Sequence, residues 1–273
     1  MSRNLAVLMT AYNAEKSIGP AIESLKRDPE PFDLLIVDDC SRMPVAELIG
    51  TTDPDIEIIR PAKNLGVAGA KNLGLKHLLA RHYEFIAMMD ADDICVSGRL
   101  AKQVCFLKEN PDVGLVGSWA RFVDENTREV AFHFRPPCKA QDIHNALFLN
   151  NCIMHPTWMV RTEVLRASGL YSTEFPAAED YELLRRMAGR FKFENLPEFL
   201  LDYTISMSGV SVSRRRRQLL DRLRIQAKYF DPRRPNAWLG ILRTVALFAL
   251  PRSFVAAYRY ELNWRFRRDL NAA

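Results

Sequence analysis

Three carboxylates follow directly on a short apolar run, and this arrangement constrains the fold more than any other feature of the sequence. Residues 85–89 are all apolar, and directly after them come Asp90, Asp92 and Asp93. A continuous apolar run of this length is typical of a strand buried on both faces of a parallel sheet. Ligands of open α/β sheets bind outside the carboxyl ends of such strands. The sequence therefore predicts an α/β sheet with a ligand site at the end of this strand.

The same carboxylates indicate a metal site. Acidic groups this close together repel one another and lose solvation unless they share a cation, and Mg2+ and Mn2+ prefer such oxygens. Because side chains alternate along an extended chain, we expect Asp90 and Asp92 to face one way and Asp93 another. Asp92 is the first candidate ligand, with Mn2+ or Mg2+ as the cofactor. The alternative is a solvated acidic turn.

Short apolar runs alternate with segments of helical periodicity over the first half of the chain. The expected strands are residues 5–9, 34–37, 56–59, 85–89 and 113–116, and the expected helices are residues 18–25, 68–79 and 100–107. This alternation predicts crossover helices that cover a mostly parallel sheet. Beyond residue 120 the pattern is less regular, with a strand expected around Met159 and a helix over residues 179–188.

An arginine-rich pattern begins at residues 214–217. We therefore expect a catalytic domain over residues 1–213 and a basic amphipathic helical extension over residues 214–273. The apolar stretch at 237–250 is too short to span a membrane and is interrupted by Arg243, but with its basic flanks it fits a helix lying on an anionic bilayer surface. The alternative is a helical hairpin packed on the catalytic domain or on a second subunit.

The composition points to a reducing compartment. The five cysteines are odd in number and form no Cys-x-x-Cys pair, so neither a disulfide framework nor a zinc site is expected. We expect no secretion signal, because no basic region precedes a long apolar core. These features predict a cytoplasmic protein, peripheral on the inner face of the cell membrane. Nucleic acid is not an expected partner, since the arginines cluster without a recognition module, and a homo-oligomer is left open.

Polar residues also end the other expected strands. Thr10 follows the first strand, and Asp38 and Asp39 follow the second. The sequence contains neither Gly-x-Gly-x-x-Gly nor a P-loop, so a nucleotide must be held in another way. A carboxylate can accept hydrogen bonds from a base or from ribose hydroxyls, and Asp39 suits this role, whereas Asp38 suits a turn or capping role. An N-cap or an Asx turn is the alternative for Asp39.

A pair of acids, Glu179 and Asp180, opens the expected helix at 179–188. Adjacent helical residues point about 100° apart, so the two carboxylates cannot share one task and only one can be a base. The structural alternative is a favourable interaction of both acids with the helix dipole.

Taken together, these motifs resemble the inverting family 2 glycosyltransferases, which have a GT-A fold within the nucleotide-diphospho-sugar transferase superfamily. The resemblance extends over residues 5–213. The matching segments are residues 9–13, 37–41, 64–74, 90–93 and 179–180. The resemblance implies a GT-A sheet flanked by helices, followed here by the basic extension.

The resemblance also implies roles for residues on the donor side. Thr10 and Asp39 are expected to contact the base and ribose of a nucleotide sugar, Asp90 to support the ribose, and Asp92 to hold the metal that bridges the diphosphate. Lys71 matches a basic position that contacts the nucleotide, with an exposed helical lysine as the alternative.

On the acceptor side, the resemblance implies that Asp180 removes the proton from the attacking hydroxyl in a single displacement. Glu179 is expected to orient or bind the acceptor. His155 lies in a segment shared with the family, and its alternative is a packed structural residue. Trp158 is expected in the core, with a sugar platform as the alternative. Ser211 belongs to a loop that lacks the Arg and His of many relatives, and its hydroxyl can still bond phosphate.

The expected function is that of a metal-dependent inverting glycosyltransferase of the hexosyltransferase type. It moves a sugar from a nucleotide-diphospho-sugar to a hydroxyl of a glycan or lipid-linked acceptor, in surface polysaccharide synthesis. One alternative is a non-catalytic nucleotide-sugar-binding or scaffold protein. The other is a sugar-phosphate nucleotidyltransferase, but the glycine-rich basic loop that such an enzyme needs after the first strand is absent.

Overall fold

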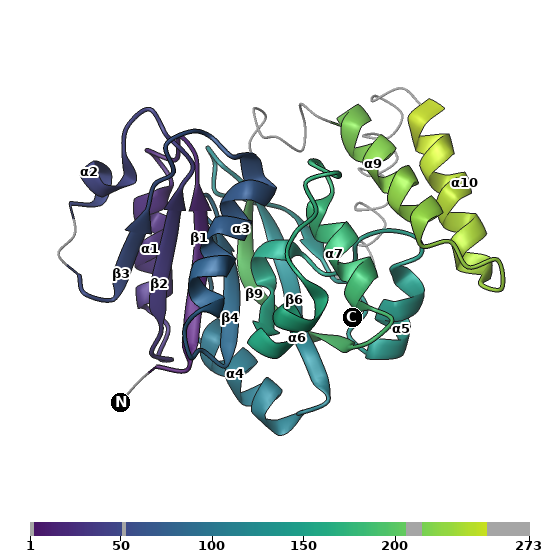
Figure 1. Ribbon diagram of the computed structural model, residues 1–273, viewed down its shortest axis with the longest axis horizontal. Coiled ribbons are helices and arrows are strands. Elements are labelled where there is room, and N and C mark those ends of the chain that lie inside the picture. The colour runs from purple at the N-terminus through teal and green to yellow at the C-terminus, as the bar shows by residue number, and fades with distance from the viewer. Residues whose placement is uncertain (1–2, 51–52, 206–214, 250–273) are drawn as a thin grey trace.

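The apolar runs of the N-terminal half form strands in the computed structural model, which describes residues 3–50, 53–205 and 215–249. These strands are β1 (Leu5–Ala11), β2 (Asp33–Asp38), β3 (Ile56–Ile59) and β4 (Phe85–Asp90). They pair in parallel in the order β3-β2-β1-β4, so their carboxyl ends lie along one edge (Figure 1). The predicted strands are confirmed to within two residues at each end.

Further strands extend the sheet in the order β4-β8-β6-β9-β5, with β7 paired to β6. They are β5 (Ile94–Cys95), β6 (Val113–Asp124), β7 (Val130–Phe134), β8 (Met159–Arg161) and β9 (Lys192–Ile205). β6 and β9 are parallel, whereas β8 is antiparallel to both of its neighbours. The mostly parallel sheet and the strand at Met159 are confirmed. β6 continues beyond its predicted end, and β9 was not predicted. The two strands pair along their lengths although they are far apart in the sequence, so no local pattern marks this pairing.

Helices flank the sheet. They are α1 (Ile18–Lys26), α2 (Val45–Ile49), α3 (Gly66–Leu79), α4 (Arg99–Glu109), α5 (Ala140–Ala146), α6 (Thr162–Ser168) and α7 (Glu179–Met187), with a 3-10 turn η1 (His155–Thr157). The four helices predicted over this part of the chain are confirmed as α1, α3, α4 and α7.

Two hydrophobic clusters bury opposite faces of the sheet. Alternate residues of β1 enter different clusters: Ala6 and Leu8 pack with side chains of α3 and α7, and Val7 and Met9 pack with side chains of α1 and α4. Figure 1 shows α1 and α3 on opposite sides of β1 and β2. The helices thus cover both faces, as a continuous apolar strand requires.

Two C-terminal helices, α9 (Arg215–Lys228) and α10 (Pro235–Ala249), lie side by side at the end of the molecule opposite β3 (Figure 1). No helix within the described ranges is long and apolar enough to cross a membrane. The expected boundary between residues 213 and 214 lies outside the described residues.

Buried acids hold α9 against α7 and the segment before it. The fully buried carboxylate of Asp221 accepts a hydrogen bond from the backbone N–H of Ala177 at 3.2 Å. On α7, Glu182 accepts hydrogen bonds from Lys228 Nζ at 3.0 Å and from the Tyr229 hydroxyl at 2.7 Å. A helix that begins the predicted extension therefore packs on the helix that carries the predicted base.

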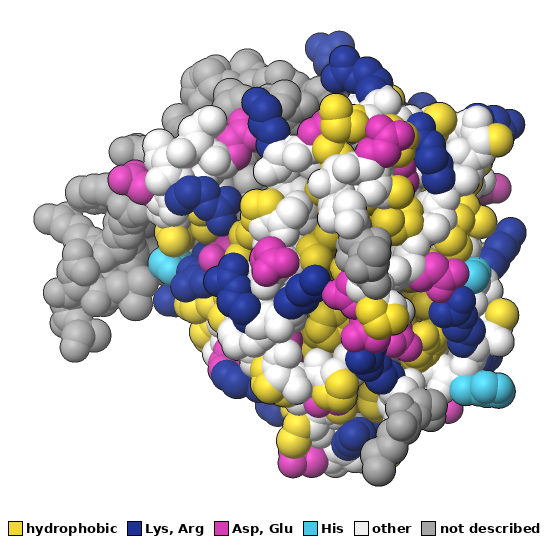
Figure 2. Space-filling model, turned by 90° about the vertical axis from the view of Figure 1, so that its left-hand side faces the viewer, with side chains coloured by type: hydrophobic (Ala, Val, Ile, Leu, Met, Phe, Trp, Pro, Cys, Tyr) yellow, Lys and Arg dark blue, Asp and Glu magenta, His cyan; other side chains and the backbone are white. Residues whose placement is uncertain are grey.

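The edge of the sheet at β3 carries mixed charge. Figure 2, which views the molecule from this side, shows basic and acidic side chains interspersed. Ion pairs account for part of this pattern, since Arg3 Nη1 lies 2.8 Å from a carboxylate oxygen of Asp33 and Arg81 Nη2 lies 2.6 Å from one of Glu57. The chain has a formal net charge of +5, and on this side of the molecule the positive charge is not gathered into one basic face.

Candidate functional site

The carboxyl ends of three neighbouring strands bring the predicted donor-side residues together. In the register of β1 with β4, Thr10 lies directly opposite Asp90. On the other side of β1, the backbone N–H of Asp39 donates to the carbonyl of Ala11 at 2.8 Å, just beyond the end of β2. Thr10, Asp39 and Asp90 therefore line the same edge of the sheet, as the parallel arrangement predicts.

Asp38 is a structural carboxylate at this edge. It is buried and accepts hydrogen bonds from the backbone N–H groups of Ser41, at 2.9 Å, and Val45, at 3.1 Å. The Arg60 guanidinium also donates to it. Burial alone would raise the pKa of Asp38, but these hydrogen bonds outweigh burial and lower it. This arrangement fits the turn and capping role expected from the sequence.

Asp39 makes contacts far along the chain. Its Oδ1 accepts a hydrogen bond from the backbone N–H of Leu65 at 2.7 Å, and its carbonyl accepts one from the Asn64 side chain at 2.9 Å. Gly66 adopts a φ of +71°, a conformation that favours glycine, at the start of α3. Burial raises the pKa of Asp39. The Asx-turn alternative does not describe these contacts, but the capping alternative does in part, because the Asp39 carboxylate accepts from a backbone N–H at the N-terminus of α3.

The acids behind β4 form one cluster. One carboxylate oxygen from each of Asp90, Asp92 and Asp93 lies within 4.8 Å of the others. Asp93 thus reaches the same cluster as the other two acids, although Asp93 is fully buried and Asp92 is exposed. β4 ends at Asp90, and the backbone N–H of Asp93 folds back to the carbonyl of Asp90 at 3.3 Å, so the alternation of an extended strand no longer applies.

The cluster has the chemistry of a divalent cation site. Asp93 Oδ1 accepts a hydrogen bond from the backbone N–H of Thr204 at 2.9 Å, whereas its buried Oδ2 has no partner among the described residues. Loss of solvation raises the pKa of all three acids, and the charge of Asp90 helps to raise that of Asp92 to about 6. A hard cation offers the free oxygen a partner and removes the repulsion, so these residues fit Mg2+ or Mn2+.

A second group of charged residues joins α3 to the start of α7. Lys71 Nζ lies 3.0 Å from Glu179 Oε1, and both residues are buried. The alternative of an exposed lysine is therefore wrong. Burial opposes the charge of Lys71, but attraction to Glu179, Asp90 and Asp180 raises its pKa. Lys71 is thus a buried cation between the two sets of acids.

The carboxylate of Asp180 is held at both oxygens. Oδ2 accepts a hydrogen bond from the Asn151 side chain at 2.8 Å, and Oδ1 accepts one from the backbone N–H of Tyr181 at 2.7 Å. Burial, reinforced by the charge of Glu179, raises the pKa of Asp180 to about 6. A carboxyl group with this pKa can act as a general base near neutral pH.

His155 lies near Asp90, at the end of β4. Its Nε2 lies 2.8 Å from the Tyr171 hydroxyl, and its Nδ1 lies 4.0 Å from Asp90 Oδ1 without a hydrogen-bond partner among the described residues. Burial, with the charges of Lys71 and Arg99, lowers the pKa of His155 well below its ordinary value, so the ring is neutral.

The predictions for Trp158 and Ser211 have different outcomes. Trp158 is fully buried and donates from Nε1 to the carbonyl of Ile153 at 3.0 Å, so it packs in the core rather than offering a sugar platform. Ser211 lies in the segment 206–214, outside the described residues, and its predicted role has no structural outcome.

Three residues organise this site in roles that were not predicted from the sequence: Asn72, Tyr171 and Asn151. Asn72 holds Tyr171 by two hydrogen bonds, donating to its carbonyl at 2.9 Å and accepting from its backbone N–H at 2.8 Å. Asn151 holds Asp180. No local motif marks these contacts, because the partners are far apart in the sequence. The signals were that Asn72 lies in the matching segment at residues 64–74 and that Asn151 begins the segment, shared with the family, that contains His155.

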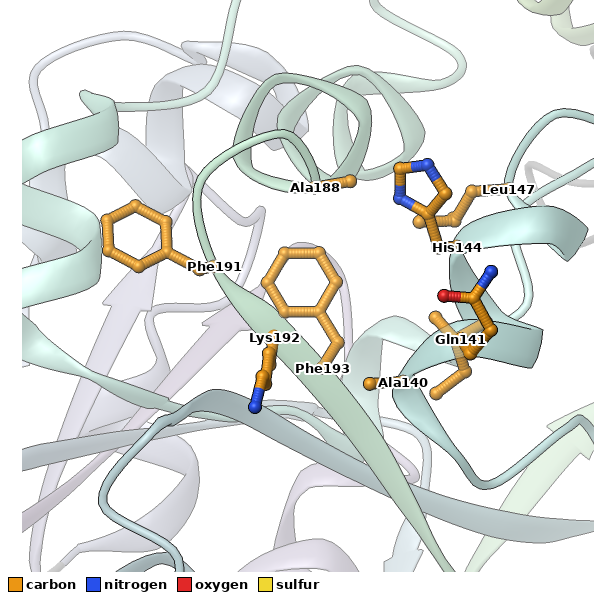
Figure 3. A pocket seen from close by; sticks show the side chains of 9 residues that line it. Ala140, Gln141, His144, Leu147, Ala188, Phe191, Lys192 and Phe193 are labelled. Carbon is orange, nitrogen blue, oxygen red and sulfur yellow. The ribbon is translucent and has the colours of Figure 1, made fainter. Parts of the chain in front are cut away.

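A separate pocket of about 200 Å³ lies between α5, the end of α7 and the start of β9 (Figure 3). Leu147 and Phe193 provide apolar lining, and His144 and Lys192 provide polar lining. None of the predicted site residues lines this pocket. The candidate site is instead the edge of the sheet where the strand-end acids, Lys71 and the start of α7 meet.

Solved structures share this fold. S. aureus TarS in complex with UDP-GlcNAc is 19% identical, with a TM-score of 0.66, over 90% of this chain and 71% of that chain. The mannosyltransferase PcManGT from Pyrobaculum calidifontis, in complex with GDP-Man and Mn2+, is 20% identical, with a TM-score of 0.64, over 91% of this chain and 71% of that chain. The expected GT-A fold is thereby confirmed.

Relatives identified by sequence are named as glycosyltransferases. An uncharacterized glycosyltransferase of Methanocaldococcus jannaschii is 32% identical over 79% of this chain and 76% of that protein. The Escherichia coli UDP-Glc:alpha-D-GlcNAc-diphosphoundecaprenol beta-1,3-glucosyltransferase WfgD is 30% identical over 66% of this chain and 67% of that protein. The family model described as glycosyl transferase family 2 matches residues 6–169. The chain therefore belongs to glycosyltransferase family 2.

Proposed function

We propose that this glycosyltransferase is metal-dependent and inverting, and that it transfers a hexose from a nucleotide-diphospho-sugar to a hydroxyl of a glycan or lipid-linked acceptor in surface polysaccharide synthesis. One observation carries the proposal. One site contains both a carboxylate cluster suited to a cation and a separate carboxylate, that of Asp180, with the pKa of a base. The buried ion pair of Lys71 with Glu179 joins the two.

On the donor side, Thr10, Asp39 and Asp90 take the base and ribose. Asp92, assisted by its neighbours in the cluster, would hold Mn2+ or Mg2+, and a bound ion would supply positive charge for the departing nucleoside diphosphate. Lys71, a buried cation, adds positive charge on the same side. Support comes from the solved neighbours, one of which holds UDP-GlcNAc and another GDP-Man with Mn2+.

On the acceptor side, Asp180 accepts the proton of the attacking hydroxyl. The new bond from the acceptor oxygen to the anomeric carbon forms as the bond to the diphosphate breaks, so the configuration inverts in one step and no sugar–enzyme bond forms. Asn151 keeps the base oriented toward this proton, and Glu179 orients the acceptor from the adjacent position. His155 is neutral and lies near Asp90, where it can contact the donor. Ser211 is proposed as a phosphate contact.

The acceptor and location are further parts of the proposal. The name of the relative WfgD includes a diphosphoundecaprenol acceptor, which supports a lipid-linked acceptor here. All five cysteines are free, which supports a reducing, cytoplasmic location.

Thermal unfolding of the full chain with UDP-, GDP- and dTDP-sugars, each with and without Mn2+, tests the donor half of the proposal. A ligand at 100 times its dissociation constant stabilises by about 2.7 kcal/mol. We expect one class of donor to raise the unfolding midpoint in a Mn2+-dependent manner. If none of the donors raised the unfolding midpoint of the folded protein, the proposal would be contradicted.

Product analysis tests the chemistry. We expect free nucleoside diphosphate and a product of inverted anomeric configuration, and we expect Asp180→Asn to abolish transfer while the donor-induced shift remains. Release of pyrophosphate would instead indicate a nucleotidyltransferase. Donor binding without turnover on any glycan or lipid-linked acceptor would indicate a binding protein, and equal turnover by Asp180→Asn would refute the assignment of the base.

A further inference from the structure

The outer face of α10 exposes a continuous apolar stripe. Its five large hydrophobic side chains are 45% to 65% exposed: Trp238, Leu239, Leu242, Val245 and Phe248. We call this set the α10 stripe. At about 100° per residue, the five positions fall within about half of the helix circumference. The stripe is therefore one surface of the helix and not a scatter of single exposed residues.

The opposite side of α10 packs on the protein. Ala237 and Thr244 are buried, and a Cβ added at Gly240 would overlap the carbonyl oxygen of Phe148. The helix therefore has two apolar faces, and only one is used for packing among the described residues. An exposed apolar surface of this kind marks a site of contact with a partner or a membrane.

Other large hydrophobic side chains are also exposed on the described residues, but they are spread along the chain: Tyr12, Met43, Leu65, Val67 and Leu220. Single exposed hydrophobic residues are normal on a protein surface. The concentration of five on one helix is therefore particular to α10.

The tryptophan of the stripe is oriented by its neighbours. Its ring packs edge-on against Phe230, with 4.8 Å between ring centroids, and its Nε1 donates to the carbonyl of Pro232 at 3.2 Å. Trp238 nonetheless remains 54% exposed. An indole with a satisfied N–H and an exposed apolar body suits the boundary between water and lipid.

The charges around the stripe are basic. Exposed Arg243 lies one turn after Leu239, and exposed Arg233 lies in the connection that precedes α10. The helix itself contains no acidic residue. In the sequence, residues 250–273 then add five arginines against two acidic residues. A second copy of the chain would bring like charges together across a symmetric interface, whereas an anionic lipid surface is complementary.

From these observations we propose that the α10 stripe docks on an anionic lipid surface, with α10 lying in the plane of the headgroups. This inference rests on the proposed function in one respect only: docking brings the site close to the proposed lipid-linked acceptor. α9 connects the two regions, because it packs against α10, while its Lys228 donates a hydrogen bond to Glu182 of α7 and its Asp221 accepts one from Ala177 just before α7. Docking therefore fixes the helix that carries Asp180 relative to the lipid surface.

Co-sedimentation of the full chain with vesicles tests the proposal. The vesicles contain phosphatidylcholine with phosphatidylglycerol, or phosphatidylcholine alone. The variant is the double substitution Leu239→Gln and Leu242→Gln. The control is the single substitution Met43→Gln, which changes a large hydrophobic side chain, 48% exposed, outside α10. We expect binding to the anionic vesicles that weakens with salt, a fall of at least about tenfold in the double variant, and no fall in the control.

Two results would overturn the proposal: absence of binding to anionic vesicles by the wild-type chain, or equal binding by the double variant. A wild-type dimer that the double variant converts to a monomer, without vesicle binding by either, would assign the stripe to a second copy. The unfolding midpoint establishes that the variant is folded. The donor-induced shift without vesicles reports on the proposed function alone, so failure of docking and failure of donor binding are distinguishable.

Discussion

The Asn151 side chain donates a hydrogen bond of 2.8 Å to Oδ2 of Asp180 and so joins the segment before η1 to the first turn of α7. A hydrogen bond to the charged form of a carboxyl group favours that form, and this bond lowers the pKa of Asp180 against the opposing effect of burial. Asn151 is therefore placed to set both the direction and the basicity of the proposed base.

We expect Asn151→Ala to raise the pKa of Asp180 above about 6 and to reduce kcat at neutral pH by about 10- to 100-fold, the worth of one hydrogen bond to a charged group. The measurement is the pH profile of kcat/KM, whose acidic limb should move to higher pH. Asn126→Ala, at an exposed turn, serves as the control. An unchanged profile would show that Asn151 has only a packing role.

The pKa of Asp180 also predicts the pH dependence of the wild-type enzyme. The base must be ionised to accept a proton, and its pKa is raised from 3.8 to about 6. Activity should therefore be full above about pH 7 and fall about tenfold per unit below pH 6. Rates measured across this range with saturating donor test the expectation, and an acidic limb near pH 4 would contradict it.

The same raised pKa predicts a cost in stability. The folded state disfavours the ionised carboxylate, so the unfolding free energy falls as the pH rises from 3.8 through about 6. At neutral pH, Asp180→Asn should therefore stabilise the protein, by about 1–3 kcal/mol. Denaturant unfolding at pH 7 measures the change, and at pH 3 the difference between the two proteins should largely vanish.

The buried pair of Lys71 and Glu179 predicts an asymmetric response to substitution. Lys71→Met leaves the Glu179 carboxylate buried without its partner and should destabilise by about 3–5 kcal/mol. Adding Glu179→Gln should recover much of this loss. The control is Lys102→Met, because Lys102 pairs with Glu198 on the surface, where both side chains are nearly half exposed, and should change stability by at most about 1 kcal/mol. Equal losses of stability in Lys71→Met and Lys102→Met would contradict the prediction.

The acid cluster predicts that a divalent ion stabilises the fold. Mn2+ at 100 times its dissociation constant should raise the free energy of unfolding by about 2.7 kcal/mol, and chelation should reverse the change. Asp92→Asn should remove most of this effect, whereas Asp142→Asn, at an exposed position on α5, should leave it intact. Thermal unfolding with and without the metal measures both. A Mn2+ shift that persists in Asp92→Asn would place the ion elsewhere.

The order of the motifs and the ends of the parallel strands were predictable from sequence. Apolar runs such as residues 85–89 specify buried strands locally, and parallel pairing then places Thr10, Asp39 and Asp90 at one edge. The turn after β4 was not predictable, because the orientation of Asp93 depends on a backbone hydrogen bond to Asp90 and on Thr204, which belongs to a distant strand.

By itself, then, the sequence determined the fold class, the family and the acids of the site, because periodicity and short motifs are local properties of the chain. Only the tertiary structure decided that Lys71 is a buried partner of Glu179, that His155 is neutral against Tyr171, and that Asn151 holds Asp180. The charge and direction of these groups depend on burial and on partners far along the chain, and both arise only when the chain folds.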